Sequence, residues 1–248
     1  MIRIYFRFYE ELNDFLPAGR RRIPFPITIS GNPSVKDAIE SLGVPHVEVD
    51  LILVNGISVD FSYKLKNEDS VSVFPVFESL DITSVTHLRS KPLREIKFIL
   101  DVHLGKLAKY LRLFGFDTFY RKDYDDNEII RLALSDKRII LTRDIDLLKN
   151  KLVTHGYWVR SQIPMKQLNE VIQRFDLKNE FRVFTRCIEC NGLIDQVSKQ
   201  EILPRLLPMT RRYYRKFFKC NECDRIYWQG SHYKRMKEYV KDLMNELK

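Results

Sequence analysis

The sequence lacks several features that would place the chain in particular protein classes. No apolar run approaches the ~20 residues that a membrane-spanning helix needs, and the strand-like residues 1–6 have no signal-peptide layout. No internal repeat or low-complexity segment is present. We therefore expect a globular protein of the cytoplasm with no membrane partner. Its 248 residues allow one large domain or two to three small ones.

Cysteine is scarce, which argues against a disulfide framework. The four cysteines form two CxxC pairs, Cys187 with Cys190 and Cys220 with Cys223, about thirty residues apart. Each pair is suited to offer two thiolates to one tetrahedral zinc ion, and a closed four-thiolate site leaves no open position for catalysis. The spacing predicts a structural zinc site, with a redox role for either pair as the alternative.

Acidic and basic residues are unevenly distributed along the chain. Residues 1–80 hold 8 Lys and Arg against 11 Asp and Glu, whereas residues 181–248 hold 15 against 8. The formal net charge of the whole chain is +9. A basic C-terminal part beside a mildly acidic N-terminal part indicates an anionic partner at one end of the chain.

Cations and aromatic residues alternate in residues 211–219. Guanidinium groups can hold phosphates while rings stack on unpaired bases. We therefore expect four cations of this stretch to bind RNA, namely Arg211, Arg212, Arg215 and Lys216. In the alternative interpretation, Phe217 and Phe218 pack in a small core and only the cations face outward.

Residues 1–80 follow the order strand, strand, helix, strand, strand, strand. The signals are an alternating strand at 2–8, a proline-bearing edge strand at 24–29, a capped helix at 34–43, a hairpin around Asn55-Gly56 and a last strand at 69–77. This order resembles the β-grasp, ubiquitin-like fold of small sulfur-carrier proteins. Those carriers end in a free Gly-Gly, whereas Val76-Phe77-Glu78-Ser79 stands here. We expect a module that docks a protein partner or stabilises the chain, not a carrier.

Residues 81–95 are polar and mixed, and we interpret them as a linker. Strand and helix patterns then alternate through residues 96–180, which favours a parallel sheet with helices on its faces. The first helix of this region has apolar residues on one face at Leu104, Leu107, Ala108, Leu111 and Phe114, and Gly115 is placed to end it. From about residue 181 the paired cysteines mark a third unit, residues 181–248.

Acidic residues follow or flank the strands of residues 96–180. Asp101 ends the apolar run 98–100, Asp144 follows the strand 138–142, and Asp126 opens the helix after the strand 117–121. In open parallel sheets, this edge is where ligands bind. Clustered carboxylates suit Mg²⁺ or Mn²⁺, which can polarise a phosphate and generate a hydroxide for in-line attack. The alternative for each acid is a helix N-cap.

Several spaced motifs together resemble the Mut7-C family, a group of PIN-like ribonuclease domains with a zinc-ribbon tail. They are residues 98–101, 107–117 and 141–144 and the two cysteine pairs, and the ubiquitin-like residues 1–80 match the Ub-Mut7-C arrangement. The resemblance implies an α/β fold with a PIN-like parallel-sheet nuclease domain between a β-grasp domain and a zinc ribbon. It also implies metal-dependent hydrolysis of RNA phosphodiester bonds to 5′-phosphate and 3′-hydroxyl products.

The resemblance assigns roles to individual acids. It implies metal-binding, catalytic acids at Asp101, Asp126 and Asp144, and Asp146 matches the second acid of an Asp-x-Asp pair. Glu128 is the substitute if the second acid is misplaced. Thr142 would support Asp144 through its hydroxyl, although ordinary β-propensity explains a threonine there equally well.

Basic residues beside the acids are candidates for holding the RNA backbone. Lys106, Lys109 and Arg112 lie at i, i+3 and i+6 on one polar helix face, and Arg112 and Arg143 also match the family motif. We expect Lys106, Arg112 and Arg143 to bind substrate, whereas a solvated helix face is the alternative, above all for Lys109. His103 more often packs against a neighbouring loop than touches substrate.

A rival function comes from another class. The chain could be a non-catalytic RNA-binding adaptor, which would use the zinc ribbon for RNA and the β-grasp domain for a protein. No residue excludes a DNA repair nuclease. The aspartates after the strands favour the ribonuclease, whereas the ribbon and the basic stretch fit both.

Overall fold

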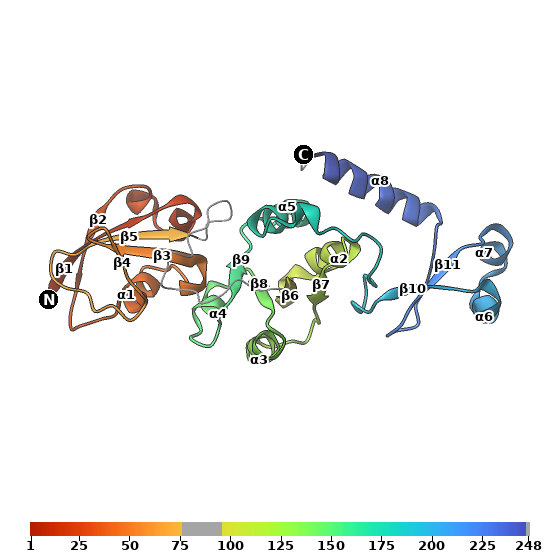
Figure 1. Ribbon diagram of the computed structural model, residues 1–248, viewed down its shortest axis with the longest axis horizontal. Helices are drawn as coiled ribbons and strands as arrows, with labels where there is room; N and C mark the ends of the chain where they lie inside the picture. The colour runs from red at the N-terminus through yellow and green to blue at the C-terminus, as the bar shows by residue number, and fades with distance from the viewer. Residues whose placement is uncertain (76–95, 247–248) are drawn as a thin grey trace. The chain divides into compact units, whose positions relative to one another are not determined.

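The computed structural model describes residues 1–75 and 96–246 of the chain, and Figure 1 shows the order of its elements. The predicted linker at 81–95 lies outside these residues. The described residues pack into two compact units. The first unit comprises the described residues of Met1–Glu95 and Asp125–Val159. The second unit comprises those of Ile96–Tyr124 and Arg160–Lys248.

The N-terminal part of the first unit is a β-grasp fold, as predicted. Its sheet has the order β2-β1-β5-β3-β4, in which β1 and β5 are parallel and the other pairs antiparallel. The strands are β1 (Ile2–Phe8), β2 (Phe25–Ile29), β3 (Val49–Val54), β4 (Ile57–Ser58) and β5 (Ser70–Pro75). The proline-bearing β2 lies at the sheet edge, where a missing backbone donor breaks no ladder.

Local sequence signals fix the helix and the hairpin of this fold. Helix α1 (Val35–Ser41) begins at a capping box in which Ser34 and Asp37 bond each other's backbone N–H groups. Its Val35 and Ile39 are fully buried in the core. Asn55 and Gly56 join β3 to β4 with φ angles of 52° and 84°. Two successive positive φ values are what the predicted Asn-Gly turn requires.

The rest of the first unit packs against the β-grasp part. It comprises α3 (Asp126–Asp136), β8 (Ile139–Thr142), α4 (Ile145–Lys149) and β9 (Gly156–Trp158), with β8 and β9 parallel. The fully buried Glu48, in η3 (His46–Glu48), accepts a 2.6 Å hydrogen bond from the Trp158 backbone N–H. The rings of Phe15 and Trp158 lie 5.0 Å apart. The middle of the predicted nuclease domain therefore packs with the β-grasp residues, and the domain boundaries stay a prediction.

The second unit begins with a parallel strand pair and the predicted helix. Strands β6 (Lys97–Leu100) and β7 (Asp117–Phe119) flank η4 (Val102–Leu104) and α2 (Gly105–Leu113) in the chain. The five residues of the predicted apolar face, Leu104, Leu107, Ala108, Leu111 and Phe114, are at most 1% exposed. Gly115 follows α2 with φ of 96°, where a Cβ atom would collide with the Arg182 backbone. Helix α5 (Pro164–Arg174) packs against α2.

The C-terminal part of the second unit is a small antiparallel sheet with helices around it. The sheet has the order β10-β11-β12, with β10 (Ile194–Val197), β11 (Phe217–Cys220) and β12 (Ile226–Trp228). The helices are α6 (Lys199–Ile202), α7 (Pro208–Tyr213) and α8 (Ser231–Glu246), with the 3-10 segment η6 (Leu203–Arg205) directly after α6. Further 3-10 segments of the chain are η1 (Glu10–Phe15), η2 (Ala18–Arg20) and η5 (Leu177–Asn179). Phe217 is fully buried beside Ile202 and Leu206. None of the described helices has the length and apolarity needed to cross a membrane.

Candidate metal centre and candidate active site

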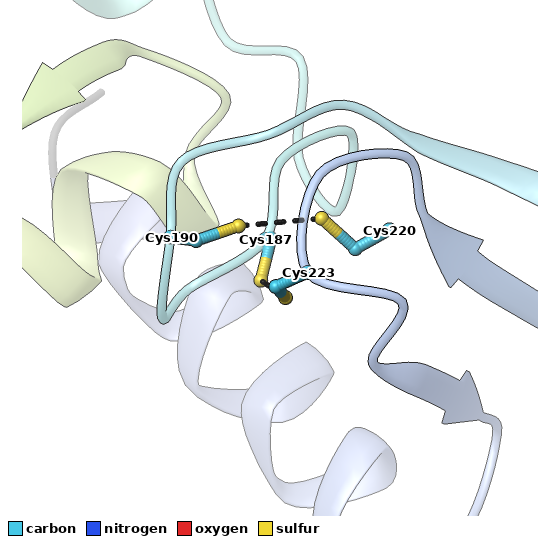
Figure 2. Close-up of side chains that lie close together, drawn as sticks. All are labelled: Cys187, Cys190, Cys220 and Cys223. Atoms are coloured by element: carbon cyan, nitrogen blue, oxygen red, sulfur yellow. Dashed lines mark hydrogen bonds between the residues drawn. The ribbon is translucent and has the colours of Figure 1, made fainter.

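The four cysteines come together as their spacing predicts. Figure 2 shows the side chains of Cys187 and Cys190 from one loop facing those of Cys220 and Cys223 from another. All four sulfur atoms lie within 4.8 Å of one another. The separation is 3.6 Å between Cys187 Sγ and Cys223 Sγ, and 3.3 Å between Cys190 Sγ and Cys220 Sγ. Zinc bound at 2.3 Å to four thiolates sets such separations at about 3.8 Å, so this cluster is compatible with a zinc site.

The surroundings of the sulfurs favour one thiolate in particular. Burial opposes ionisation of Cys187, but hydrogen bonds from the Tyr227 hydroxyl and from backbone N–H groups lower the pKa of its thiol to about 7. The Tyr227 oxygen lies 2.9 Å from Cys187 Sγ. Burial raises the pKa of Cys190 and of Cys223. A bound cation would supply the positive charge that the full set of thiolates needs, because metal ligation requires deprotonated cysteines.

Arg112 fastens the first cysteine loop to the core of the second unit. It is 2% exposed, and its guanidinium donates to the carbonyl oxygens of Thr118 at 2.9 Å and Glu189 at 2.7 Å. Longer bonds run to the carbonyls of Ile188 and Tyr120. These contacts contradict the predicted RNA contact, because a buried guanidinium already bonded to four carbonyls is not available to a phosphate. Arg112 instead has a structural role that its helical spacing did not reveal.

Asp101 stands at the carboxyl end of β6, as predicted, and is 6% exposed. It occupies the N-cap position of η4, but its side chain makes no capping hydrogen bond. The alternative interpretation of Asp101 as a helix cap is therefore wrong. Tyr120, just past the end of β7, donates from its hydroxyl to the Val102 carbonyl at 3.1 Å. The carboxyl ends of β6 and β7 thus meet at one edge, as parallel strands require.

Asp126 is the first residue of α3, and its neighbour provides the cap. The Asp125 carboxylate accepts a 2.8 Å hydrogen bond from the Glu128 backbone N–H. The capping interpretation therefore applies to Asp125 and not to Asp126. The Glu128 carboxylate is paired with Arg131 at 2.8 Å. The choice between Asp126 and Glu128 as the second acid stays a prediction.

Asp144 follows β8 and caps α4. Its carboxylate accepts hydrogen bonds from the backbone N–H groups of Asp146 at 2.8 Å and Leu147 at 3.5 Å. The buried Thr142 hydroxyl accepts the Asp144 backbone N–H at 2.8 Å, so Thr142 supports the main chain at Asp144. Asp146 is 90% exposed in its side chain and lies 3.3 Å from Lys149. The Asp144 carboxylate can cap the helix and bind a metal ion at the same time, because its two oxygens have several lone pairs.

Within the first unit, Asp126 and Asp144 belong to neighbouring elements, since Asp126 begins α3, Asp144 follows β8, and α3 packs against β8. Helix α3 ends at Asp136, and Lys137, with φ of 53°, lies at its C-cap. Asp101 belongs to the second unit. Convergence of all four acids at one site stays a prediction.

The remaining predicted substrate-binding residues are on the surface or partly so. Lys106 is exposed on α2, whereas Lys109 is paired with Glu189 at 2.9 Å. Arg143 is half-buried and donates to the Val159 carbonyl at 3.4 Å. The cations of the basic stretch are all exposed, namely Arg211, Arg212, Arg215 and Lys216. Because Phe217 is buried while the cations face outward, the packing alternative holds for that ring.

Trp158 and Glu48 form a link that the sequence did not reveal. The Trp158 indole N–H donates to the Arg143 carbonyl at 3.3 Å, directly before Asp144, while Glu48 holds the Trp158 backbone. The two residues are 110 positions apart. No spacing rule connects positions so distant, so only the fold could show that the β-grasp part supports the Asp144 junction.

Two family models agree with the predicted order of a ubiquitin-like part before a nuclease part. A family model described as Mut7-C RNAse domain matches residues 96–240, and one described as Mut7-C ubiquitin matches residues 1–81. No curated protein matches the chain. Two structures of the small archaeal modifier protein 1 of Haloferax volcanii are similar to it at 18% and 17% identity, each with a TM-score of 0.25. They cover 30% and 32% of this chain and 98% and 99% of their own.

Proposed function

Because the chain belongs to the Mut7-C RNAse domain family, we propose that it is a ribonuclease that uses Mg²⁺ or Mn²⁺ at Asp101, Asp126, Asp144 and Asp146. The observation that carries the assignment is the position of Asp101. It is 6% exposed at the carboxyl end of β6, where the family resemblance implies a metal-binding acid. The predicted family, and its order after a ubiquitin-like domain, are confirmed by the two family models.

The acids suit the proposed metal by their chemistry. All are oxygen donors, which hard divalent cations prefer to nitrogen or sulfur. A divalent cation held there would polarise the scissile phosphate and assist formation of the attacking hydroxide. By family resemblance the products would carry a 5′-phosphate and a 3′-hydroxyl.

The side chains of the protein would position the reactants. The Thr142 hydroxyl and the α4 N-terminus fix the backbone and carboxylate of Asp144. Lys106 and Arg143 would bind phosphates near the acids, and the exposed cations Arg211, Arg212, Arg215 and Lys216 would bind the strand at the ribbon. The four cysteines would hold a structural zinc, which a reducing compartment such as the cytoplasm would permit.

A cleavage assay tests the proposal. Wild type, Asp101→Asn and Asp123→Asn are compared on single-stranded RNA with Mg²⁺ or Mn²⁺. Asp123 is the matched control, because it is exposed and paired with Arg121. We expect Asp101→Asn to lose at least about 100-fold in rate, since a metal site contributes several kcal/mol. Asp123→Asn should stay within about twofold of wild type.

The same assay distinguishes the rival functions. Equal cleavage by wild type and Asp101→Asn would refute the proposed site. RNA binding without cleavage under either metal would favour the adaptor, with the β-grasp residues as its protein-docking surface. Faster cleavage of single-stranded DNA than of RNA would favour the DNA nuclease.

A further inference from the structure

A cavity of about 860 Å³ lies within the second unit, on the zinc ribbon. It is lined by residues of α2, the first cysteine loop, all three ribbon strands and α8. Six of its lining residues are aromatic, namely Phe184, Tyr214, Phe218, Tyr227, Trp228 and Tyr233. The basic stretch 211–219 supplies only Tyr214 and Phe218 of these rings, and the proposed chemistry at the acids accounts for none of them.

Trp228 is the ring most available to a ligand. Trp228 is 37% exposed and is the most accessible of the six rings, because the other five aromatic residues are half-buried. A Cβ atom at Gly230 would lie 2.9 Å from the indole nitrogen, so the glycine leaves room for the indole to lie against the main chain. The ring centroids of Tyr214 and Trp228 lie 6.4 Å apart, with an interplanar angle of 48°. The two tilted rings leave an indole face that a flat ligand can use.

Charge at the cavity favours an anionic ligand. Arg225, Lys109 and Arg186 are among its lining residues, with Glu189 as the acid. Glu189 is neutralised by Lys109, and Arg186 is engaged with Asp117 and backbone carbonyls. Arg225 is exposed, and its side chain makes no hydrogen bond or ion pair with the described residues. A ligand with flat rings and negative charge is thus complementary to the cavity.

We propose that this cavity binds unpaired bases of single-stranded RNA, with Trp228 as the stacking surface and Arg225 on an adjacent phosphate. Stacking on exposed aromatics is sequence-tolerant and demands unpaired bases, because paired bases do not offer their faces. The volume is in the range of sites that enclose small organic ligands, which is adequate for one or two bases. The proposal deepens the proposed function, since it rests on RNA as the substrate.

The test measures binding without cleavage. The chain has two tryptophans, so Trp158→Phe leaves Trp228 as the only indole, and Asp101→Asn added to it prevents the proposed cleavage. A single-stranded oligouridylate is titrated into this zinc-loaded, full-length double variant, and a blunt RNA duplex is the comparison. We expect saturable quenching of Trp228 fluorescence by the single strand and little by the duplex.

Affinity variants complete the test. In the Asp101→Asn background, Trp228→Leu should weaken binding of the single strand roughly 10-fold, since one stacked base contributes on the order of 1–3 kcal/mol. Trp228→Phe should give a smaller loss. Ile57→Ala is the control, because Ile57 is a 70% exposed apolar residue of the β-grasp part and does not line the cavity. Arg225→Ala should lower the slope of log affinity against log salt concentration by about one, as expected for the loss of one phosphate contact.

The outcomes separate this inference from the proposed function. Unchanged affinity of a zinc-loaded Trp228→Leu protein, or binding of the single strand without any change in Trp228 fluorescence, would overturn it. Tight, Trp228-dependent binding by a wild-type protein that cleaves no RNA would refute the nuclease and support the cavity. Cleavage that is lost in Asp101→Asn but binding indifferent to Trp228 would support the nuclease and refute the cavity.

Discussion

The cysteine cluster and the acid-bearing junctions differ in how the chain builds them. Two four-residue loops bring all four sulfurs within 4.8 Å, so each loop supplies half a metal site by itself. The acids come one or two at a time from separate turns, and helix capping uses the same carboxylates, as at Asp144. A short spacing rule therefore predicts the first kind of site, whereas the second depends on how distant elements pack.

The acids also differ among themselves. Asp101 is buried and does not cap, while Asp144 is exposed and caps α4. The capping alternative is thus excluded for Asp101 and satisfied for Asp144. Substitutions can separate the two roles at Asp144, because asparagine caps a helix as well as aspartate does.

The largest expected effect is loss of the cysteine cluster. In Cys187→Ser combined with Cys220→Ser, we expect zinc to be lost and the ribbon to unfold, because structural zinc contributes on the order of 10 kcal/mol to such folds. Zinc content and near-ultraviolet circular dichroism measure both effects. Glu222→Gln, an exposed non-ligand in the second loop, is the control and should keep its zinc. Full zinc binding by the double variant would show that the cluster is not the site.

The next effect concerns the attachment of the first cysteine loop. Arg112→Met should destabilise the protein by about 3 kcal/mol, because it leaves the buried carbonyl of Thr118 and the carbonyl of Glu189 without their donor. Urea denaturation measures the loss. Lys106→Met on the exposed side of the same helix should change stability by less than about 0.5 kcal/mol. Equal stability of the two variants, with RNA affinity lost only in Arg112→Met, would restore the original RNA contact.

Asp144 then tests whether capping and catalysis share one carboxylate. Asp144→Asn should keep its stability and lose roughly 100-fold in cleavage rate, because the cap remains while the charge is lost. Asp144→Ala should lose a similar factor in rate and also about 1 kcal/mol of stability. Thermal unfolding and RNA cleavage are measured on both proteins. Wild-type activity in Asp144→Asn would reduce this residue to a cap.

The smallest effect concerns the link between the β-grasp part and the Asp144 junction. Trp158→Phe keeps a ring beside Phe15 but removes the hydrogen bond to the Arg143 carbonyl. We expect a loss of about 1 kcal/mol in the free energy of unfolding. Trp228→Phe, at an indole that donates no hydrogen bond within the described part of the chain, serves as the control and should cost less than about 0.5 kcal/mol. No difference between these variants would mean that the link carries little energy.

Much of the fold follows from local patterns. The apolar face from Leu104 to Phe114, the Ser34 capping box and the Asn55-Gly56 turn all depend on residues within a few positions of one another, and the structure has each of them. The cysteine cluster belongs to the same class, since each half is local.

What could not be predicted depends on partners far along the chain. Arg112 has a polar spacing shared with Lys106, yet its carbonyl partners at Ile188 and Glu189 are 76 and 77 residues away. Glu48 meets Trp158 over 110 residues. The sequence also could not show which of two adjacent aspartates caps α3. Both Asp125 and Asp126 are good capping residues, and only the residue at which the helix begins decides between them.

The most direct test of a catalytic metal site separate from the zinc site is Mn²⁺ binding to the zinc-loaded protein, followed by electron paramagnetic resonance. We expect Mn²⁺ to bind wild type while zinc stays in place, and we expect Asp101→Asn to lose at least about 10-fold in Mn²⁺ affinity with its zinc content unchanged. Equal Mn²⁺ affinity of wild type and Asp101→Asn would contradict the assignment of the buried carboxylate to the metal.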